Sequence, residues 1–264
     1  MNVEAHTRSL TVAIPGLNEE KNIRATIEAV FAAAGKCPDL ALEVLVIDDG
    51  STDRTAEIVE ELARHYGNLR LLKNPRNLGL GASIRRAIAE ASSERFIFIP
   101  GDNDIPLTTL ELLFSNGYTA DMVMCYFLND ESRGRIRYLI STLFRLIYTS
   151  TFDIYVIYVN GPAVYPTRKL RELMLHSTRF SIVAEINVKL LRQGLSYTEL
   201  PSNRQVGLEG STSATLRSLM ETARVYLQLL MDVYVRERSR YSSRPVRVNY
   251  DPPMREPEKA RKIA

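Results

Sequence analysis

The sequence predicts an α/β protein with a mostly parallel, doubly wound sheet and helices on both faces. Two observations support this fold class. Short apolar runs recur four times within residues 1–105, and amphipathic helical patterns separate them. Parallel strands need crossover connections, which helices supply. With 264 residues, 45% of them hydrophobic, the chain can bury the core of one such domain.

The first two units each consist of a strand, a polar loop and a helix. An apolar run at 10–15 ends in proline and polar residues, and apolar positions then recur at helical spacing over 23–31. The second unit has a strand at 43–47, a turn at 48–53 and a helix with apolar positions over 56–62. These units predict the first two parallel strands.

Two further strands complete the first half. A short strand at 69–72 precedes a glycine-containing loop and a helix over 79–88, and a buried strand follows at 96–99. The second half is less regular. It is predicted to contain a helix and a strand (122–125) within 110–128, a helix over 135–150, a strand at 154–159, a helix over 181–193 and a C-terminal amphipathic helix over 215–235.

Composition excludes several classes of protein. Lys and Arg total 34 against 31 Asp and Glu, and a net charge of +3 does not indicate a nucleic-acid partner. Cys37 and Cys125 lie far apart, without neighbours at metal-ligand spacing, which argues against a disulfide scaffold or a zinc site and fits a cytoplasmic protein. No signal peptide or membrane-spanning run is recognised. Residues 236–264, rich in Arg, Pro, Ser and Lys, are predicted to form a basic, disordered tail.

Acidic side chains follow two of the predicted strands. Asp48 and Asp49 come directly after the second strand, and Asp102 and Asp104 come shortly after the fourth. Parallel strands end at one edge of a sheet, where ligands of such folds bind, so we expect these carboxylates near Asn18. Carboxylates can bind a nucleoside, and a D-x-D pair can hold a hard cation that bridges two phosphates. Each segment alone is also typical of a turn or helix cap, but their joint occurrence favours a nucleotide and metal site.

These residues belong to four segments whose order and spacing resemble those of family 2 glycosyltransferases, at 13–20, 46–55, 74–81 and 102–104. Within that family the chain most resembles the dolichyl- or polyprenyl-phosphate mannose synthase group. The resemblance implies a single GT-A (Rossmann-like) domain over residues 1–235. It also implies a GDP- or UDP-sugar as the donor, Mg²⁺ or Mn²⁺ as the cofactor, and inversion at the anomeric carbon.

The resemblance also implies roles for individual residues. The nucleoside pocket would be lined by Pro15, Asn18, Glu19 and Asp48, with Asp49 as a support. The donor-binding set also includes Ser51, Asp102, Asn103 and Arg204, of which Arg204 belongs to a loop that closes over the donor phosphates. Asp102 and Asp104 would serve the ribose and the metal, with Asp104 as the main metal ligand.

The acceptor is expected to be a lipid phosphate or a glycan. A phosphate oxygen is already ionised, whereas a sugar hydroxyl needs a base, for which Glu185 and Asp153 are the candidates. The helix over 135–150 either lies peripherally on the inner face of the membrane or is a core helix with a basic solvent face.

The chain departs from the group at three positions, and two of them concern the acceptor. Phe127 and Thr212 stand where basic residues are usual, and the D-x-D lacks the glutamine that commonly follows it. The first two changes remove positive charge from the phosphate side of the site. A hydroxyl-acceptor transferase of polysaccharide or glycolipid synthesis and a degenerate nucleotide-sugar-binding protein are the alternatives. A nucleotidyltransferase fits less well, because segment 15–20 is acidic where that class has a glycine-rich loop followed by Arg and Lys.

Overall fold

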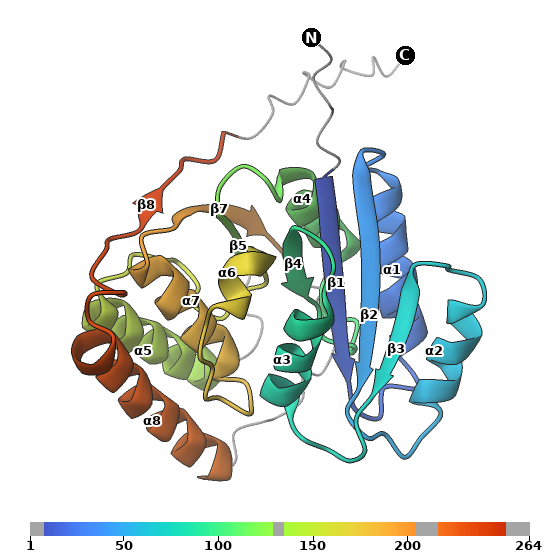
Figure 1. Ribbon diagram of the computed structural model, residues 1–264, viewed down its shortest axis with the longest axis horizontal. Helices are drawn as coiled ribbons and strands as arrows, with labels where there is room; N and C mark the ends of the chain where they lie inside the picture. Colours follow the sequence, from blue (N-terminus) through green and yellow to red (C-terminus); the bar gives the residue numbers. More distant parts are fainter. Residues whose placement is uncertain (1–7, 129–134, 204–215, 252–264) are drawn as a thin grey trace.

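The computed structural model describes residues 8–128, 135–203 and 216–251. Its centre is an eight-stranded sheet in the order β3-β2-β1-β4-β6-β5-β7-β8 (Figure 1). Strand β6 is antiparallel to both β4 and β5, and the other neighbouring strands pair in parallel. The strands are β1 (Arg8–Gly16), β2 (Leu40–Asp48), β3 (Leu69–Lys73), β4 (Arg95–Phe98), β5 (Met122–Phe127), β6 (Ala163–Pro166), β7 (Ser196–Ser202) and β8 (Val246–Arg247).

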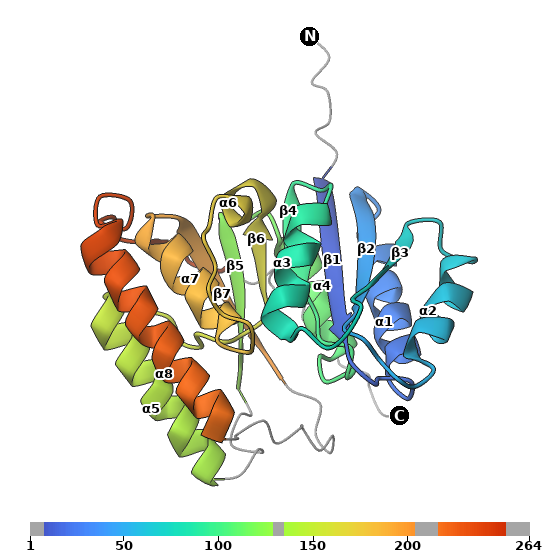
Figure 2. The same cartoon turned by 60° about the horizontal axis from the view of Figure 1, so that its bottom comes forward.

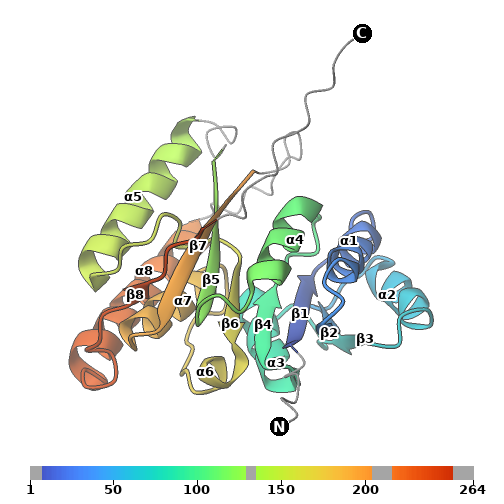
Figure 3. The ribbon, with the colours of Figure 1, turned by 90° about the horizontal axis from the view of Figure 1, so that it is seen from above.

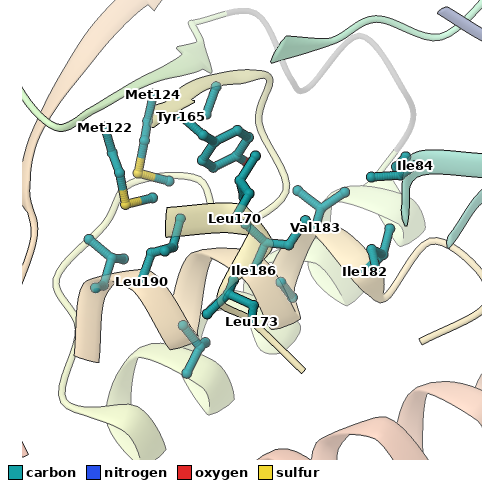
Figure 4. Close-up of a cluster of buried hydrophobic side chains, with 14 of the residues drawn as sticks. Ile84, Met122, Met124, Tyr165, Leu170, Leu173, Ile182, Val183, Ile186 and Leu190 are labelled. Carbon is teal, nitrogen blue, oxygen red and sulfur yellow. The ribbon is translucent and has the colours of Figure 1, made fainter. Parts of the chain in front are cut away.

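Helices cover both faces of the sheet (Figure 3). One face packs against α1 (Ile23–Gly35), α2 (Thr55–Ala63) and α4 (Leu107–Asn116). The other packs against α3 (Leu80–Glu90), α6 (Thr167–Arg171) and α7 (Ile182–Arg192). Figure 4 shows part of this second layer, where Met122 and Met124 point from β5 toward α7.

The alternation of side chains along the strands explains the two layers. In β2, Val44 and Val46 belong to the core beneath α1, α2 and α4, whereas Leu45 and Ile47 face α3. Successive side chains of a strand point to opposite faces, and all four are fully buried. A continuous apolar run therefore marks a strand covered on both sides, as the sequence predicts.

Two long helices form a further layer beyond α7 (Figure 2). They are α5 (Arg135–Phe152) and α8 (Leu216–Met231), the latter continuing into a π-helical turn over Asp232–Arg236. Aromatic side chains hold them together: the rings of Tyr148 and Tyr226 meet edge to face with centroids 5.3 Å apart. None of the helices in the described segments is long and apolar enough to cross a membrane.

One strand predicted in the second half is wrong. Residues 154–159 are not a strand but an irregular segment, whose Ile154, Val156 and Val159 are buried at near-alternate positions. The backbone N–H of Ile157 donates to the Glu199 carboxylate at 2.5 Å rather than to a neighbouring strand. The alternation therefore reflects a loop packed on the core. Conversely, the sequence prediction included neither β6 nor β7, although β7 pairs in parallel with β5 from Tyr197 to Ser202.

The described chain also continues beyond residue 235, where the sequence places the start of a disordered tail. Tyr241 is fully buried in the main core, and β8 pairs with the first residues of β7. The carbonyl oxygen of Tyr241 accepts a hydrogen bond from Arg192 Nε at 3.0 Å. The basic composition of this segment predicted disorder and gave no sign of these contacts. For residues 236–251 the prediction of a disordered tail is therefore wrong.

Candidate active site

The acidic residues meet at the carboxyl edge of the sheet, the lower edge in Figure 1. Strands β2, β1 and β4 are adjacent there. The chain moves from β1 outward to β2 and β3 and then returns to the other side of β1 to form β4. This reversal is a topological switch point, where the loops of neighbouring strands diverge and leave room for a ligand.

The loop after β1 is tied to the loop after β2 by reciprocal hydrogen bonds. Asn18 has a left-handed backbone (φ 57°), and its N–H donates to Ser51 Oγ at 2.9 Å. Its side-chain Oδ1 accepts the backbone N–H of Thr52, also at 2.9 Å. Glu19 N–H donates to Thr55 Oγ1 at 2.8 Å. The structure thus brings Asn18, Glu19 and Ser51 together.

Asp48 and Asp49 have different surroundings although both are buried. Asp48 Oδ1 accepts the N–H of Ser51 at 3.0 Å, and within the described chain its Oδ2 accepts no hydrogen bond. The Asp49 carboxylate accepts three, from Asn74 Nδ2 (2.7 Å), Leu78 N (3.0 Å) and Gly79 N (2.8 Å). The last two donors precede α3, so Asp49 caps that helix from a neighbouring strand, where its negative charge is favourable. Asp49 organises the loop over 74–79, and Asp48 retains acceptor capacity.

The segment after β4 lies beside the end of β1. Gly101 N–H donates to the carbonyl oxygen of Pro15 at 3.1 Å. Asp102 Oδ1 then accepts the N–H of Asp104 at 3.2 Å, around Asn103, which has a left-handed backbone (φ 58°). This turn places the D-x-D at the switch point between β1 and β4.

Negative charge accumulates at this point. Burial raises the pKa of Glu19, the side-chain hydrogen bond from Asn22 opposes the shift, and the charge of Asp102 adds to it. Glu19 lies against Gly101, where a Cβ would be 3.4 Å from Glu19 Cγ, so its carboxylate is beside the start of the D-x-D. A cation at this position would relieve the repulsion.

The donor set at the D-x-D fits a hard divalent cation. Among the described residues, no group of three or more His, Cys, Asp or Glu side chains is arranged to hold a metal. Mg²⁺ sites that also bind substrate phosphates commonly use one or two carboxylates and complete the shell with phosphate oxygens and water. Asp102 and Asp104 match that smaller donor set.

Glu185 lies in the first turn of α7 and is almost fully buried. Its carboxylate accepts the backbone N–H groups of His176 and Ser177, each at 2.9 Å, and lies 3.1 Å from Lys189 Nζ. Lys189 in turn pairs with Asp232 at 2.9 Å. Both oxygens of Glu185 are therefore engaged in holding the chain before α7.

Asp153 lies near the opposite edge of the sheet. Its Oδ2 is 3.1 Å from Arg244 Nε and 3.9 Å from Arg192 NH1. Arg192 ends α7, and Arg244 comes just before β8, which pairs with the beginning of β7. The strand β7 spans about 20 Å between the two edges. The structure thus does not bring Asp153 to the other acidic residues.

Two positions of the expected phosphate side, Arg204 and Thr212, lie outside the described residues. Phe127, at the end of β5, is buried and meets Tyr158 edge to face with ring centroids 6.3 Å apart. An aromatic contact therefore occupies the position where a basic residue is usual.

Sequence reasoning missed several residues that shape the site. Lys189 follows Glu185 by four residues, a spacing at which opposite charges meet on one helix face, so this signal was present. Glu221 of α8 and Asp232 in the turn after α8 reach the same region from far along the chain, and nothing local to them indicates this proximity.

Solved structures show which known fold the chain shares. The glucosyl-3-phosphoglycerate synthase of Mycobacterium tuberculosis, solved with Mg²⁺ and UDP, is 19% identical, with a TM-score of 0.59 over 85% of this chain and 79% of that one. The fold is that of the GT-A glycosyltransferases.

The sequence then assigns the family. Residues 11–170 match the model described as glycosyl transferase family 2, which is more than half of the chain, and the protein belongs to this family. A dolichyl-phosphate beta-glucosyltransferase of Trichomonas vaginalis is 34% identical over 104 residues, 38% of this chain and 32% of the relative. The human dolichyl-phosphate beta-glucosyltransferase is 28% identical over 116 residues, 42% of this chain and 36% of the relative. The chain thus spans about a third of the length of these curated relatives.

Proposed function

We propose that the protein is an inverting glycosyltransferase that moves a sugar from a UDP- or GDP-sugar to a polyprenyl phosphate. The observation that carries this proposal is the set of carboxylates at the switch point between β1 and β4, in a chain of family 2. The names of the relatives, dolichyl-phosphate beta-glucosyltransferases, support a lipid-phosphate acceptor.

On the donor side, Asp48 binds the nucleoside together with Pro15, Asn18 and Glu19. The acceptor capacity of Asp48 Oδ2 supports this role, because a base edge or a ribose diol presents donors to it. Ser51 and Asn103 shape the adjoining turns, and Arg204 is proposed to approach the donor phosphates.

Asp102 and Asp104 would hold Mg²⁺ or Mn²⁺, which when bound neutralises the charge of the departing diphosphate. Without such compensation, the carboxylates of Glu19, Asp102 and Asp104 would repel the donor phosphates. The solved glucosyl-3-phosphoglycerate synthase with Mn²⁺ and UDP-glucose supports this cofactor by analogy of fold.

The transfer itself is a direct displacement. An ionised acceptor oxygen forms a bond to the anomeric carbon from the face opposite the diphosphate, while the bond from that carbon to the diphosphate oxygen breaks and the nucleoside diphosphate leaves. A phosphate acceptor needs no general base. This suits a site where Glu185 is occupied by backbone N–H groups and Asp153 lies at the other edge of the sheet. We therefore assign Glu185 a positioning role in place of the expected catalytic one.

A lipid acceptor also gives a role to the outer faces of α5 and α8. Large apolar side chains are exposed along both helices, namely Leu139, Ile140, Leu143, Leu146, Ile147, Met220, Leu227 and Met231. Exposed apolar stripes on neighbouring helices suit the interface of a bilayer. We propose peripheral contact with the cytoplasmic face of the membrane through these helices. Flotation with liposomes checks it: Leu143→Glu together with Leu227→Glu should abolish binding, and unchanged binding would contradict it.

The donor proposal is tested with Asp104→Asn, using Asp39→Asn as the matched control because Asp39 is exposed before β2 at the other edge of the sheet. Wild type should gain thermal stability with a UDP- or GDP-sugar only when Mn²⁺ is present, because a ligand that binds the native state alone stabilises it. Asp104→Asn should lose that gain, whereas Asp39→Asn should keep it.

Transfer to a polyprenyl phosphate, compared with transfer to free sugars, identifies the acceptor. Asp104→Asn should lower lipid transfer about 100-fold or more, as the loss of an electrostatic group that acts on the leaving charge does. Wild-type-like activity of this variant would reject the metal role. Transfer to sugars alone would favour the hydroxyl-acceptor alternative.

A further inference from the structure

The segment over 174–181, which we call the bridging loop, lies between α8 and the start of α3. It connects α6 to α7 and lies on the same side of the sheet as α3 and α8 (Figure 2). Its backbone makes hydrogen bonds in both directions, to α8 on one side and to α3 on the other. The donor-side loop over 74–79 leads directly into α3, so the bridging loop connects two regions that are distant in the sequence.

On the α8 side, one carboxylate gathers the bridging loop. Glu221 Oε1 accepts the N–H of Thr178 at 3.1 Å, the N–H of Arg179 at 3.2 Å and the hydroxyl of Ser177 at 3.0 Å. Its Oε2 accepts the hydroxyl of Ser181 at 3.2 Å. Hydrogen bonds to an ionised acceptor are stronger than those between neutral groups, so Glu221 fixes this stretch of backbone to α8.

On the α3 side, the contact is backbone to backbone. Thr178 O accepts the N–H of Gly81 at 2.9 Å. A Cβ at Gly79 or Gly81 would collide with the carbonyl oxygen of Thr178 or Ser177, so the two loops touch without intervening side chains. Gly79 N–H is the group that Asp49 caps at 2.8 Å. Thr178 is thus held by α8 through its N–H and by α3 through its carbonyl.

A buried ionic network makes the base of the bridging loop rigid. Lys189 is fully buried and contacts the carbonyl oxygen of Met174 at 2.6 Å as well as Glu185 and Asp232. Asp232, in the π-helical turn after α8, also accepts from His176 Nε2 at 3.0 Å. Both ends of α8 therefore hold the loop, and a displacement of Glu221 has to move Thr178 relative to α3.

We propose that Glu221 is a positioning residue for the donor site, which sets the loop over 74–79 through Thr178 and Gly81. The role in donor binding depends on the proposed function. The mechanical link between α8 and α3 does not depend on it. The link couples the helix with the exposed apolar stripe to the loop that carries the Asp49 cap, so contact of α8 with an acceptor surface would change donor affinity.

The test compares Glu221→Ala with Glu221→Gln, in which an amide oxygen still accepts the backbone N–H groups. Glu237→Gln is the matched control, because Glu237 lies shortly after α8, pairs with Arg240 at 3.1 Å and, within the described part of the chain, makes no hydrogen bond to the bridging loop. Hydrogen exchange measured on the three variants without ligand reports the link directly. Glu221→Ala should speed exchange in peptides covering 174–181 and 78–83 and leave those covering 8–16 unchanged. Glu237→Gln should resemble wild type, and Glu221→Gln should fall between wild type and Glu221→Ala, because its amide oxygen accepts the same N–H groups more weakly.

Binding of UDP and GDP with Mn²⁺ then reports the effect on the site. Glu221→Ala should raise the dissociation constant of the nucleotide that wild type binds by about tenfold, the equivalent of roughly 1.4 kcal/mol, and Glu221→Gln should recover part of that loss. Exchange at 78–83 that stays unchanged in Glu221→Ala, or that rises everywhere in the protein, would overturn the link. Failure of wild type to bind either nucleotide would refute the proposed function instead, while the exchange result still decides the link.

Discussion

Replacing Asp49 by asparagine separates the two neighbouring aspartates after β2. The substitution keeps the size of the side chain but replaces one carboxylate oxygen by an N–H₂ donor. In the wild type, Gly79 N–H donates to Asp49 Oδ2 at 2.8 Å. If the amide oxygen of the variant keeps the bonds from Asn74 and Leu78, its N–H₂ group faces the N–H of Gly79, and two donors meet. One charge-assisted bond is lost, a buried donor is left without a partner, and α3 loses the negative charge at its N-terminus.

These losses set the expected magnitude. A hydrogen bond to a charged group contributes about 1.5–3 kcal/mol, and the two bonds that remain weaken when their acceptor becomes neutral. We expect Asp49→Asn to lower the free energy of unfolding by about 2–4 kcal/mol. Asp48→Asn should cost about 1 kcal/mol or less, because the single bond from Ser51 to Oδ1 survives in the amide. The order reverses for donor binding, where Asp48→Asn should have the larger effect at temperatures at which both variants are folded.

Urea unfolding followed by far-UV circular dichroism is the appropriate assay, since the chain contains no tryptophan for fluorescence. The midpoint should fall for Asp49→Asn with little change in the slope, which indicates a change in stability rather than in the surface exposed on unfolding. Equal destabilisation by the two substitutions would refute the reasoning, because it would mean that the hydrogen-bond count does not distinguish the two carboxylates.

Three further substitutions follow from the geometry. Gly81→Ala should destabilise the protein by about 1–3 kcal/mol through collision with the Ser177 carbonyl, and an unchanged melting temperature would contradict the close approach of the loops. Glu19→Gln should raise the melting temperature near neutral pH. Burial lifts the pKa of Glu19 above its unfolded value of 4.5, so the ionised form weakens the fold once the pH exceeds the folded-state pKa. The gain should vanish below the unfolded pKa, and a gain at acidic pH alone would show that the sign is wrong. Asp153→Asn should leave transfer rates near wild type and cost less than about 1 kcal/mol in urea, since its partner Arg244 is highly exposed; a loss of turnover would return Asp153 to the site.

The predictable part of the fold is the part with strong local signals. Strands β1 to β4 have continuous apolar runs, and the helices between them have apolar residues at clear helical spacing. Most ends of these four strands lie within one or two residues of the predicted ranges. Strand β7 has no comparable signal, because Glu199 and Pro201 interrupt its apolar residues. Its position depends on pairing with β5 more than 70 residues earlier, a contact that no local pattern records.

The same distinction applies to the site. The motif residues near β1, β2 and β4 were found because each follows its strand directly. The supports of the bridging loop were not, because Glu221 lies in α8 and Asp232 in the turn after it, about 40 or more residues along the chain from the groups they hold. Glu185 is a residue that the sequence suggests as a catalytic base but that the structure uses otherwise. Its carboxylate oxygens accept backbone N–H groups, and the sequence pattern of an acidic residue in a helix does not reveal this.

Asp48 and Asp49 illustrate how much a strand pattern can still add. Along β2, Val44 and Val46 face the layer of α1, α2 and α4, whereas Leu45 and Ile47 face α3. Continuing this alternation past the end of the strand sends Asp49 toward α3, where its charge caps the helix, and sends Asp48 to the other side, toward the turn at Ser51. The alternation of side chains along the strand therefore gives two adjacent, identical residues different roles. The carboxylate that faces the helix N-terminus becomes structural, and its neighbour keeps an oxygen for a ligand.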